Sequence, residues 1–90
     1  MKRYHVIVSG RVQGVGFRYF CVMNAQQLGL TGSVRNMSNG MVEIFIQGDE
    51  IAIDKFLAII KKGNMFINIE NYTIKQLPIV HDEQDFIYNY

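Results

Sequence analysis

The chain has 90 residues, of which 49% are hydrophobic, so it is long enough for one compact domain with one core, and we expect a single domain over residues 1–90. Nine basic and eight acidic residues leave a formal net charge of +1 without a run of like charges, which argues against a nucleic-acid partner and against a membrane-binding surface. No segment approaches the ~18 apolar residues of a membrane span, and the single cysteine, Cys21, has no disulfide partner, so we expect a cytoplasmic protein.

The first half of the chain predicts a strand, a helix and two further strands. The β-branched run from Tyr4 to Gly10 predicts a strand at the centre of a sheet. Apolar residues then recur at helical spacing from Phe17 to about Leu28, and Gly29 stands where a left-handed C-terminal cap is common. Two more runs with strand patterns follow, at Thr31–Ser38 and Met41–Gly48.

The second half predicts a hairpin turn, a second helix and a last strand. Asn39 and Gly40 are residue types that accept positive φ, so they favour a tight turn between the two preceding strands. Asp49 is a good N-cap for an amphipathic helix that ends at Gly63. A strand is predicted at Ile67–Leu77, and the C-terminal sequence DFIYNY is compatible with one more short pairing segment.

The order of these elements is strand, helix, strand, strand, helix, strand. It predicts an α+β protein with a ferredoxin-like βαββαβ sandwich, in which a four-stranded antiparallel sheet carries two helices on one face. This scaffold serves enzymes, RNA-binding domains and sensors alike, so the fold alone does not assign a function.

The most informative stretch is GRVQGVGFR, which covers Gly10–Arg18 and leads from the first strand into the first helix. Gly14 and Gly16 allow backbone conformations in which several N–H groups turn toward one point, and the helix beginning at Phe17 adds its own free N–H groups. The guanidinium of Arg18 suits two oxygens of the same anion. The pattern is neither GxGxxG nor a Walker loop. It favours a phosphate-binding turn over a purely structural tight turn.

Together with GLTGSVRN, NGMVEIFIQG and a C-terminal F-x-Y-N-Y, this stretch resembles the acylphosphatase family over nearly the whole chain. The resemblance implies a ferredoxin-like fold, hydrolysis of the carboxyl-phosphate bond of acyl phosphates, and neither metal nor cofactor. It implies a phosphate cradle formed by the backbone from Gly10 to Gly16, and a catalytic pair made of Arg18, which binds phosphate, and Asn36, which orients water. The phosphate-binding residues expected on this basis are Gln13, Gly14, Val15, Gly16, Phe17 and Arg18.

The residue types are consistent with that chemistry. A carboxylate is a good leaving group, so the reaction needs no strong general acid, and positioning with charge stabilisation is sufficient. The carboxamide of Asn36 can accept a hydrogen bond from the attacking water but is too weak a base to ionise it. We therefore expect a substrate phosphate oxygen to take the proton. We also expect inhibition by inorganic phosphate or sulfate, and a monomeric protein.

Two other functions remain open at this stage. The first is a non-catalytic acylphosphatase-like module that binds a phosphorylated metabolite, although a sequence that starts at Met1 and ends at Tyr90 without a linker leads us to expect a stand-alone enzyme. The second is an RNA-binding ferredoxin-like domain, which the near-neutral charge disfavours. The aromatic residues beside Arg18, Tyr19 and Phe20, fall on a predicted helix, whereas base-stacking aromatics of such domains belong on strands.

Overall fold

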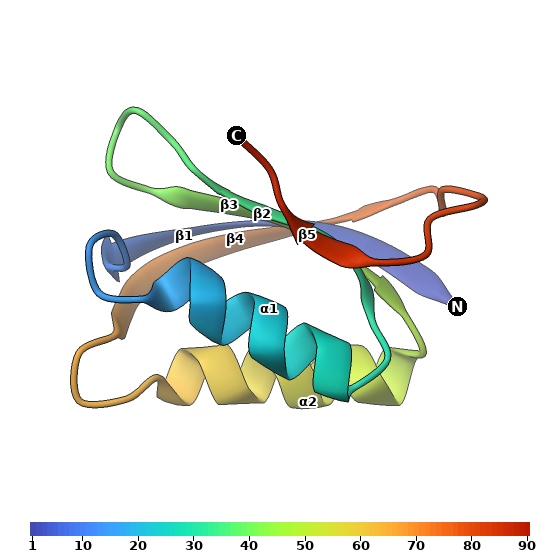
Figure 1. Cartoon of the computed structure of the whole chain (residues 1–90), viewed down its shortest axis with the longest axis horizontal. Helices are drawn as coiled ribbons and strands as arrows, with labels where there is room; N and C mark the ends of the chain where they lie inside the picture. Colours follow the sequence, from blue (N-terminus) through green and yellow to red (C-terminus); the bar gives the residue numbers. More distant parts are fainter.

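The computed structural model describes all residues 1–90 and contains five strands and two helices. In chain order these are β1 (Lys2–Arg11), α1 (Phe17–Gln27), β2 (Thr31–Asn36), β3 (Val42–Gly48), α2 (Glu50–Lys62), β4 (Asn68–Leu77) and β5 (Phe86–Tyr88). The strands form one sheet in the order β4-β1-β3-β2-β5, and both helices lie against the same face of it (Figure 1). Neither helix is long and apolar enough to cross a membrane.

The predicted ferredoxin-like arrangement is confirmed, but the predicted four-stranded antiparallel sheet is wrong in two respects: the sheet has five strands, and it is mixed. The strand β5 pairs in parallel with β2, whose outer edge would otherwise be open. The side chain of Phe86 anchors β5, because it is buried in the core and its ring lies 6.1 Å from that of Phe56. A backbone hydrogen bond of 2.9 Å from Asn89 to Val34 extends the pairing.

The core lies between the helices and the sheet. From β1, Val6 and Val8 are buried in it and Tyr4 is half-buried. From the helices, the largest buried side chains are those of Phe17 and Phe56. Because Phe17 is the first residue of α1, its burial fixes the start of that helix against the sheet.

The helix ends follow the predicted local signals. At the end of α1, Gly29 has φ +70° and the Leu30 N–H donates to the Ala25 carbonyl oxygen at 2.9 Å, which is the pattern of a Schellman cap. At the start of α2, a carboxylate oxygen of Asp49 accepts a hydrogen bond from the Ala52 N–H.

The predicted hairpin is confirmed, with a turn of slightly different form. Only Gly40 has positive φ, whereas the side chain of Asn39 accepts a hydrogen bond from the Met41 N–H at 3.0 Å. The Gly40 N–H donates to the Met37 carbonyl oxygen, and the Met37 N–H donates to the Met41 carbonyl oxygen. These two hydrogen bonds describe a type I turn followed by a bulge. Both strands are therefore shorter than predicted, and Asn36 is the last residue of β2.

The face of the sheet opposite the helices is partly covered at the end of β3: Glu43 and Phe45 are half-buried there, whereas Gln47 is fully buried. Gln47 is buried because the segment after β4 folds back over it. Its side-chain amide makes two hydrogen bonds to the backbone of Val80, at 2.8 and 2.9 Å. An ion pair of 2.9 Å between Arg3 and Glu83 holds the same segment in place.

The same open face carries a second charged group around Glu43, whose side chain is 14% exposed. Its carboxylate is hydrogen-bonded to His5 at 2.8 Å and to Arg35 at 2.6 Å. Burial alone would raise the pKa of Glu43, but these hydrogen bonds and the charge of Arg35 outweigh it, so the pKa lies below the ordinary value of 4.5.

A carboxyl group whose pKa is lowered on folding stabilises the folded state at pH values above its ordinary pKa. This stabilisation is lost as the pH falls through the pKa of the folded state. We expect Glu43→Gln to lower the free energy of unfolding at neutral pH by about 1 kcal/mol. We also expect the variant to lose less stability than the parent protein when the pH falls below 4.5. Urea denaturation at several pH values measures both effects. If the free energy of unfolding falls equally with decreasing pH in both proteins, the lowered pKa of Glu43 is contradicted.

Candidate active site

The loop between β1 and α1 begins later than the sequence suggested. Gly10, expected in the phosphate cradle, lies inside β1, where the pairing with β4 shifts register between Ser9 and Gly10. Its φ is +124°, and a Cβ there would collide with the backbone carbonyl oxygen of Asn68. Gly10 therefore permits a β-bulge and a close approach of two strands. The loop itself comprises Val12–Gly16.

The two loop glycines are required by backbone conformation and not by space. Gly14 has φ +71° and Gly16 has φ +79°, and a Cβ at either position would meet no atom within 4 Å. Gly16 precedes α1 without a capping side chain. No backbone N–H from Gln13 to Tyr19 donates to a group within the chain. The loop and the first turn of α1 therefore present a row of free hydrogen-bond donors at the positive end of the helix dipole.

The side chain of Gln13 fixes this loop to the β2–β3 hairpin. Its amide nitrogen donates to the carbonyl oxygens of Met37 and Met41, both at 2.8 Å. Because Asn36 immediately precedes Met37, these hydrogen bonds hold the loop beside the end of β2.

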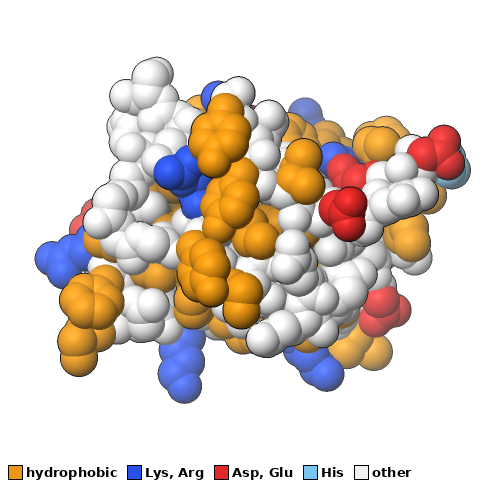
Figure 2. Space-filling view, viewed as in Figure 1, with side chains coloured by type: hydrophobic (Ala, Val, Ile, Leu, Met, Phe, Trp, Pro, Cys, Tyr) orange, Lys and Arg blue, Asp and Glu red, His pale blue; other side chains and the backbone are white.

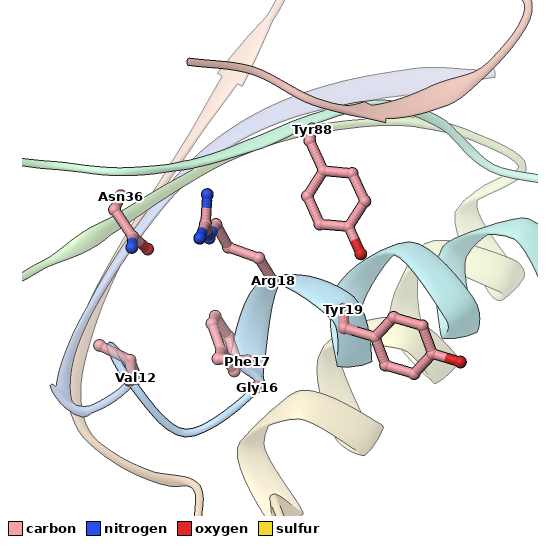
Figure 3. A pocket seen from close by; sticks show the side chains of 8 residues that line it. Val12, Gly16, Phe17, Arg18, Tyr19, Asn36 and Tyr88 are labelled. Atoms are coloured by element: carbon pink, nitrogen blue, oxygen red, sulfur yellow. The ribbon is translucent and has the colours of Figure 1, made fainter.

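A pocket of about 250 Å³ opens between the loop, α1 and the end of β2 (Figure 3). Its lining combines residues from the loop and the start of α1 with one residue each from β2 and β5. These are Val12, Gly14, Gly16, Phe17, Arg18, Tyr19, Asn36 and Tyr88.

The structure brings most of the predicted site residues together in this pocket. The predicted residues that line it are Gly14, Gly16, Phe17, Arg18 and Asn36. Gln13 and Val15 lie in the loop but do not line the pocket, and the Gln13 side chain is engaged with the hairpin. Sequence reasoning missed Tyr88, whose position depends on the unpredicted parallel pairing of β5.

Arg18 supplies an uncommitted cation to the pocket. It is half-buried, belongs to none of the ion pairs of the chain and donates no hydrogen bond within it. Its guanidinium lies between Asn36 and Tyr88 (Figure 3), and the ring of Tyr90 lies 5.8 Å from its central carbon. All five N–H donors of the guanidinium are therefore free for a ligand.

Asn36 brings a buried oxygen to the same place. Its side chain points from the end of β2 toward Arg18 and the loop (Figure 3), and Oδ1 is buried without a hydrogen-bond donor in the chain. Buried polar atoms in folded proteins are nearly always hydrogen-bonded. An acceptor left free beside free N–H groups and a cation is suited to a water molecule held next to a bound anion.

Comparison with known proteins identifies relatives over the full length of the chain. Residues 4–88 match the acylphosphatase family model. An acylphosphatase of Clostridium beijerinckii is 47% identical over 90 residues and covers 100% of both chains. An acylphosphatase of Geobacillus thermodenitrificans is 49% identical over 86 residues, which are 96% of this chain and 92% of the relative. The crystal structure of acylphosphatase from Bacillus subtilis superposes with a TM-score of 0.94 at 38% identity, over 100% of both chains.

The loop geometry predicts a specific response to substitution at Gly14. A β-branched residue at φ +71° is strained, so we expect Gly14→Val to lower the free energy of unfolding by about 1–3 kcal/mol and to weaken binding of sulfate to the loop. Urea denaturation with and without sulfate measures both. Gly14→Asn is the matched control, because asparagine tolerates the left-handed region. Equal stability of the Val and Asn variants would show that backbone conformation is not the constraint.

Proposed function

This chain belongs to the acylphosphatase family and hydrolyses acyl phosphates, and we propose that it does so without a metal or cofactor, in the pocket between the loop Val12–Gly16, Arg18 and Asn36. One observation carries this proposal: a free guanidinium and several residues with free backbone N–H groups line the same pocket. No carboxylate, imidazole or thiol lines that pocket, so its own donor set favours an anion over a cation.

We propose that the phosphoryl group binds to the backbone N–H groups from Gln13 to Phe17 and to Arg18. Gly14 and Gly16 hold the left-handed backbone conformations of a loop whose N–H groups make no hydrogen bonds within the chain. Arg18, in the first turn of α1, donates two parallel hydrogen bonds to phosphate oxygens. Together these groups neutralise the charge that accumulates on the equatorial oxygens in the transition state.

The attacking nucleophile in this proposal is a water molecule oriented by Asn36. Oδ1 of Asn36 accepts a hydrogen bond from the water and directs its lone pair at phosphorus. Because a carboxamide does not take up the proton, the proton passes to a phosphate oxygen of the substrate as the water oxygen bonds to phosphorus. The bond from phosphorus to the acyl oxygen breaks and releases a carboxylate, which needs no general acid.

The remaining parts of the proposal concern inhibition, location and oligomeric state. Inorganic phosphate and sulfate inhibit as product-like anions. Cys21 is buried and forms no disulfide, which supports a cytoplasmic location. Burial also raises the pKa of its thiol, so Cys21 is not a reactive thiolate. We propose that the 90 residues act as one domain around a single hydrophobic core, and as a monomer.

The test is steady-state hydrolysis of acetyl phosphate by the purified chain in excess chelator, with Arg18→Gln as the comparison. We expect full turnover of the parent protein, and loss of turnover together with weakened phosphate inhibition for Arg18→Gln. Stability should change little, because Arg18 forms no ion pair in the chain and its one aromatic contact, with Tyr90, is made near the end of the chain. Phosphate binding without turnover would identify a non-catalytic module instead. Unchanged phosphate inhibition in Arg18→Gln would remove Arg18 from the site.

Asn36 provides a separate prediction, because its role is in the chemical step. We expect Asn36→Ala to lower kcat on the order of 10²- to 10⁴-fold while phosphate inhibition stays nearly unchanged. Stability should change little, since Oδ1 has no partner to lose. Kinetics and urea denaturation of the same preparation measure both. A variant that keeps its kcat but binds phosphate several-fold more weakly would make Asn36 a substrate ligand.

A further inference from the structure

We propose that the side chain of Gln13 is a positioning group for the chemical step: it holds Asn36 where the attacking water is correctly oriented. This inference rests on the proposed function, which assigns the water to Asn36 and the phosphoryl group to the loop. The Gln13 side chain does not line the pocket, so it acts on the reaction only through the residue that it holds.

The Gln13 amide lies against the narrow end of the β2–β3 hairpin. Its nitrogen donates one hydrogen to the Met37 carbonyl oxygen and the other to the Met41 carbonyl oxygen, both at 2.8 Å. The same two oxygens accept the hydrogen bonds that close the hairpin, from the N–H groups of Gly40 and Met37. Because a carbonyl oxygen has two lone pairs, Gln13 completes the acceptor capacity of both groups.

No other polar contact connects this end of the hairpin to the loop. Apart from the two bonds of Gln13, no hydrogen bond or ion pair joins residues 12–16 to residues 36–42. The hairpin tip, residues 37–41, has no charged side chain, and Figure 2 shows the surface over it, at the upper left, as almost entirely uncharged. Without the Gln13 amide, the end of β2 therefore has no polar connection to the loop.

The loss of this connection affects Asn36 directly, because Asn36 is bonded to Met37. Asn36 is the last residue of β2, and its side chain points into the pocket from there (Figure 3). Catalytic groups have to lie within about 0.5 Å of their productive positions. A displacement of about 1 Å costs on the order of 10²-fold in rate. A small shift of the Met37 peptide group is therefore enough to impair the attack of water.

The anion-binding groups are anchored independently of the Gln13 side chain. Val12 and Phe17, on either side of the central part of the loop, are buried in the core. Arg18 lies in the first turn of α1, directly after Phe17. We therefore expect these groups to stay in place when the Gln13 amide is removed, so that turnover and phosphate binding respond differently.

The first experiment measures kcat for acetyl phosphate and the inhibition constant of inorganic phosphate in Gln13→Met, which keeps the side-chain length but has no N–H donor. We expect kcat to fall roughly 10- to 100-fold and the inhibition constant to stay within about twofold of the parent value. Gln27→Met, at the exposed end of α1, is the matched control and should change neither. An unchanged kcat in Gln13→Met, or phosphate binding that weakens as much as kcat falls, would refute the positioning role.

A double-mutant cycle tests whether Gln13 acts through Asn36. In an Asn36→Ala background there is no carboxamide left to position, so we expect Gln13→Met to lower kcat there by less than about threefold. A general loss of structural integrity would lower kcat by the same factor in both backgrounds, and that result would contradict the inference. Urea denaturation of the four proteins shows whether each is folded under the assay conditions.

Gln13→Glu adds a pH readout of the hydrogen bonds themselves. At neutral pH a carboxylate has no hydrogen to donate to the two carbonyl oxygens, whereas below about pH 6 the protonated acid regains one donor. We expect the kcat of Gln13→Glu, divided by that of Gln13→Met, to rise as the pH falls. A ratio independent of pH would refute the hydrogen-bonding role. If Gln13→Met does not fold, Gln13→Glu divided by the Gln27→Glu control provides the same test.

The parent protein distinguishes this inference from the proposed function. If it hydrolyses acetyl phosphate and Gln13→Met does so equally well, Gln13 has no positioning role, while the acylphosphatase activity stands. If the parent protein does not hydrolyse acetyl phosphate, the proposed function fails, and the role of Gln13 fails with it.

Discussion

The two hydrogen bonds from the Gln13 side chain to the carbonyl oxygens of Met37 and Met41 connect the two halves of the site. The loop that carries the free N–H groups belongs to the β1–α1 connection, whereas Asn36 belongs to the β2–β3 hairpin. Neither segment contacts the other through regular strand pairing at this point. A single neutral side chain, with both of its amide hydrogens engaged, therefore holds the loop proposed to bind the anion beside the residue proposed to hold the water.

The sequence predicts well those features that depend on a few neighbouring residues. The left-handed conformations of Gly14, Gly16 and Gly29, the Asp49 cap and the hairpin at Gly40 follow from local backbone chemistry, and the structure confirms them. Gly10 shows the limit of that reasoning. Its positive φ serves a bulge against β4, and the carbonyl oxygen that excludes a Cβ there belongs to Asn68, distant in the chain.

Features that depend on distant contacts were not predictable in the same way. The C-terminal sequence is compatible with a short pairing segment, but the partner and direction of β5 were not predictable, because its place beside β2 is fixed by burial of Phe86 against α2. Burial of Gln47 likewise requires the backbone of Val80. The candidate site shows the same division. Arg18 and the loop come from one continuous motif, but Tyr88 enters the pocket only because β5 pairs with β2.

The polar groups on the open face of the sheet are paired within the chain, whereas those in the pocket are not. On the open face, Arg3 and Arg35 are paired with Glu83 and Glu43. In the pocket, Arg18 has no counterion and Oδ1 of Asn36 has no donor, although burial without partners costs free energy. The fold tolerates this cost where a bound phosphoryl group and water would satisfy every one of these groups. In the proposed function, affinity for the anion is therefore supplied by groups that the chain itself leaves unsatisfied.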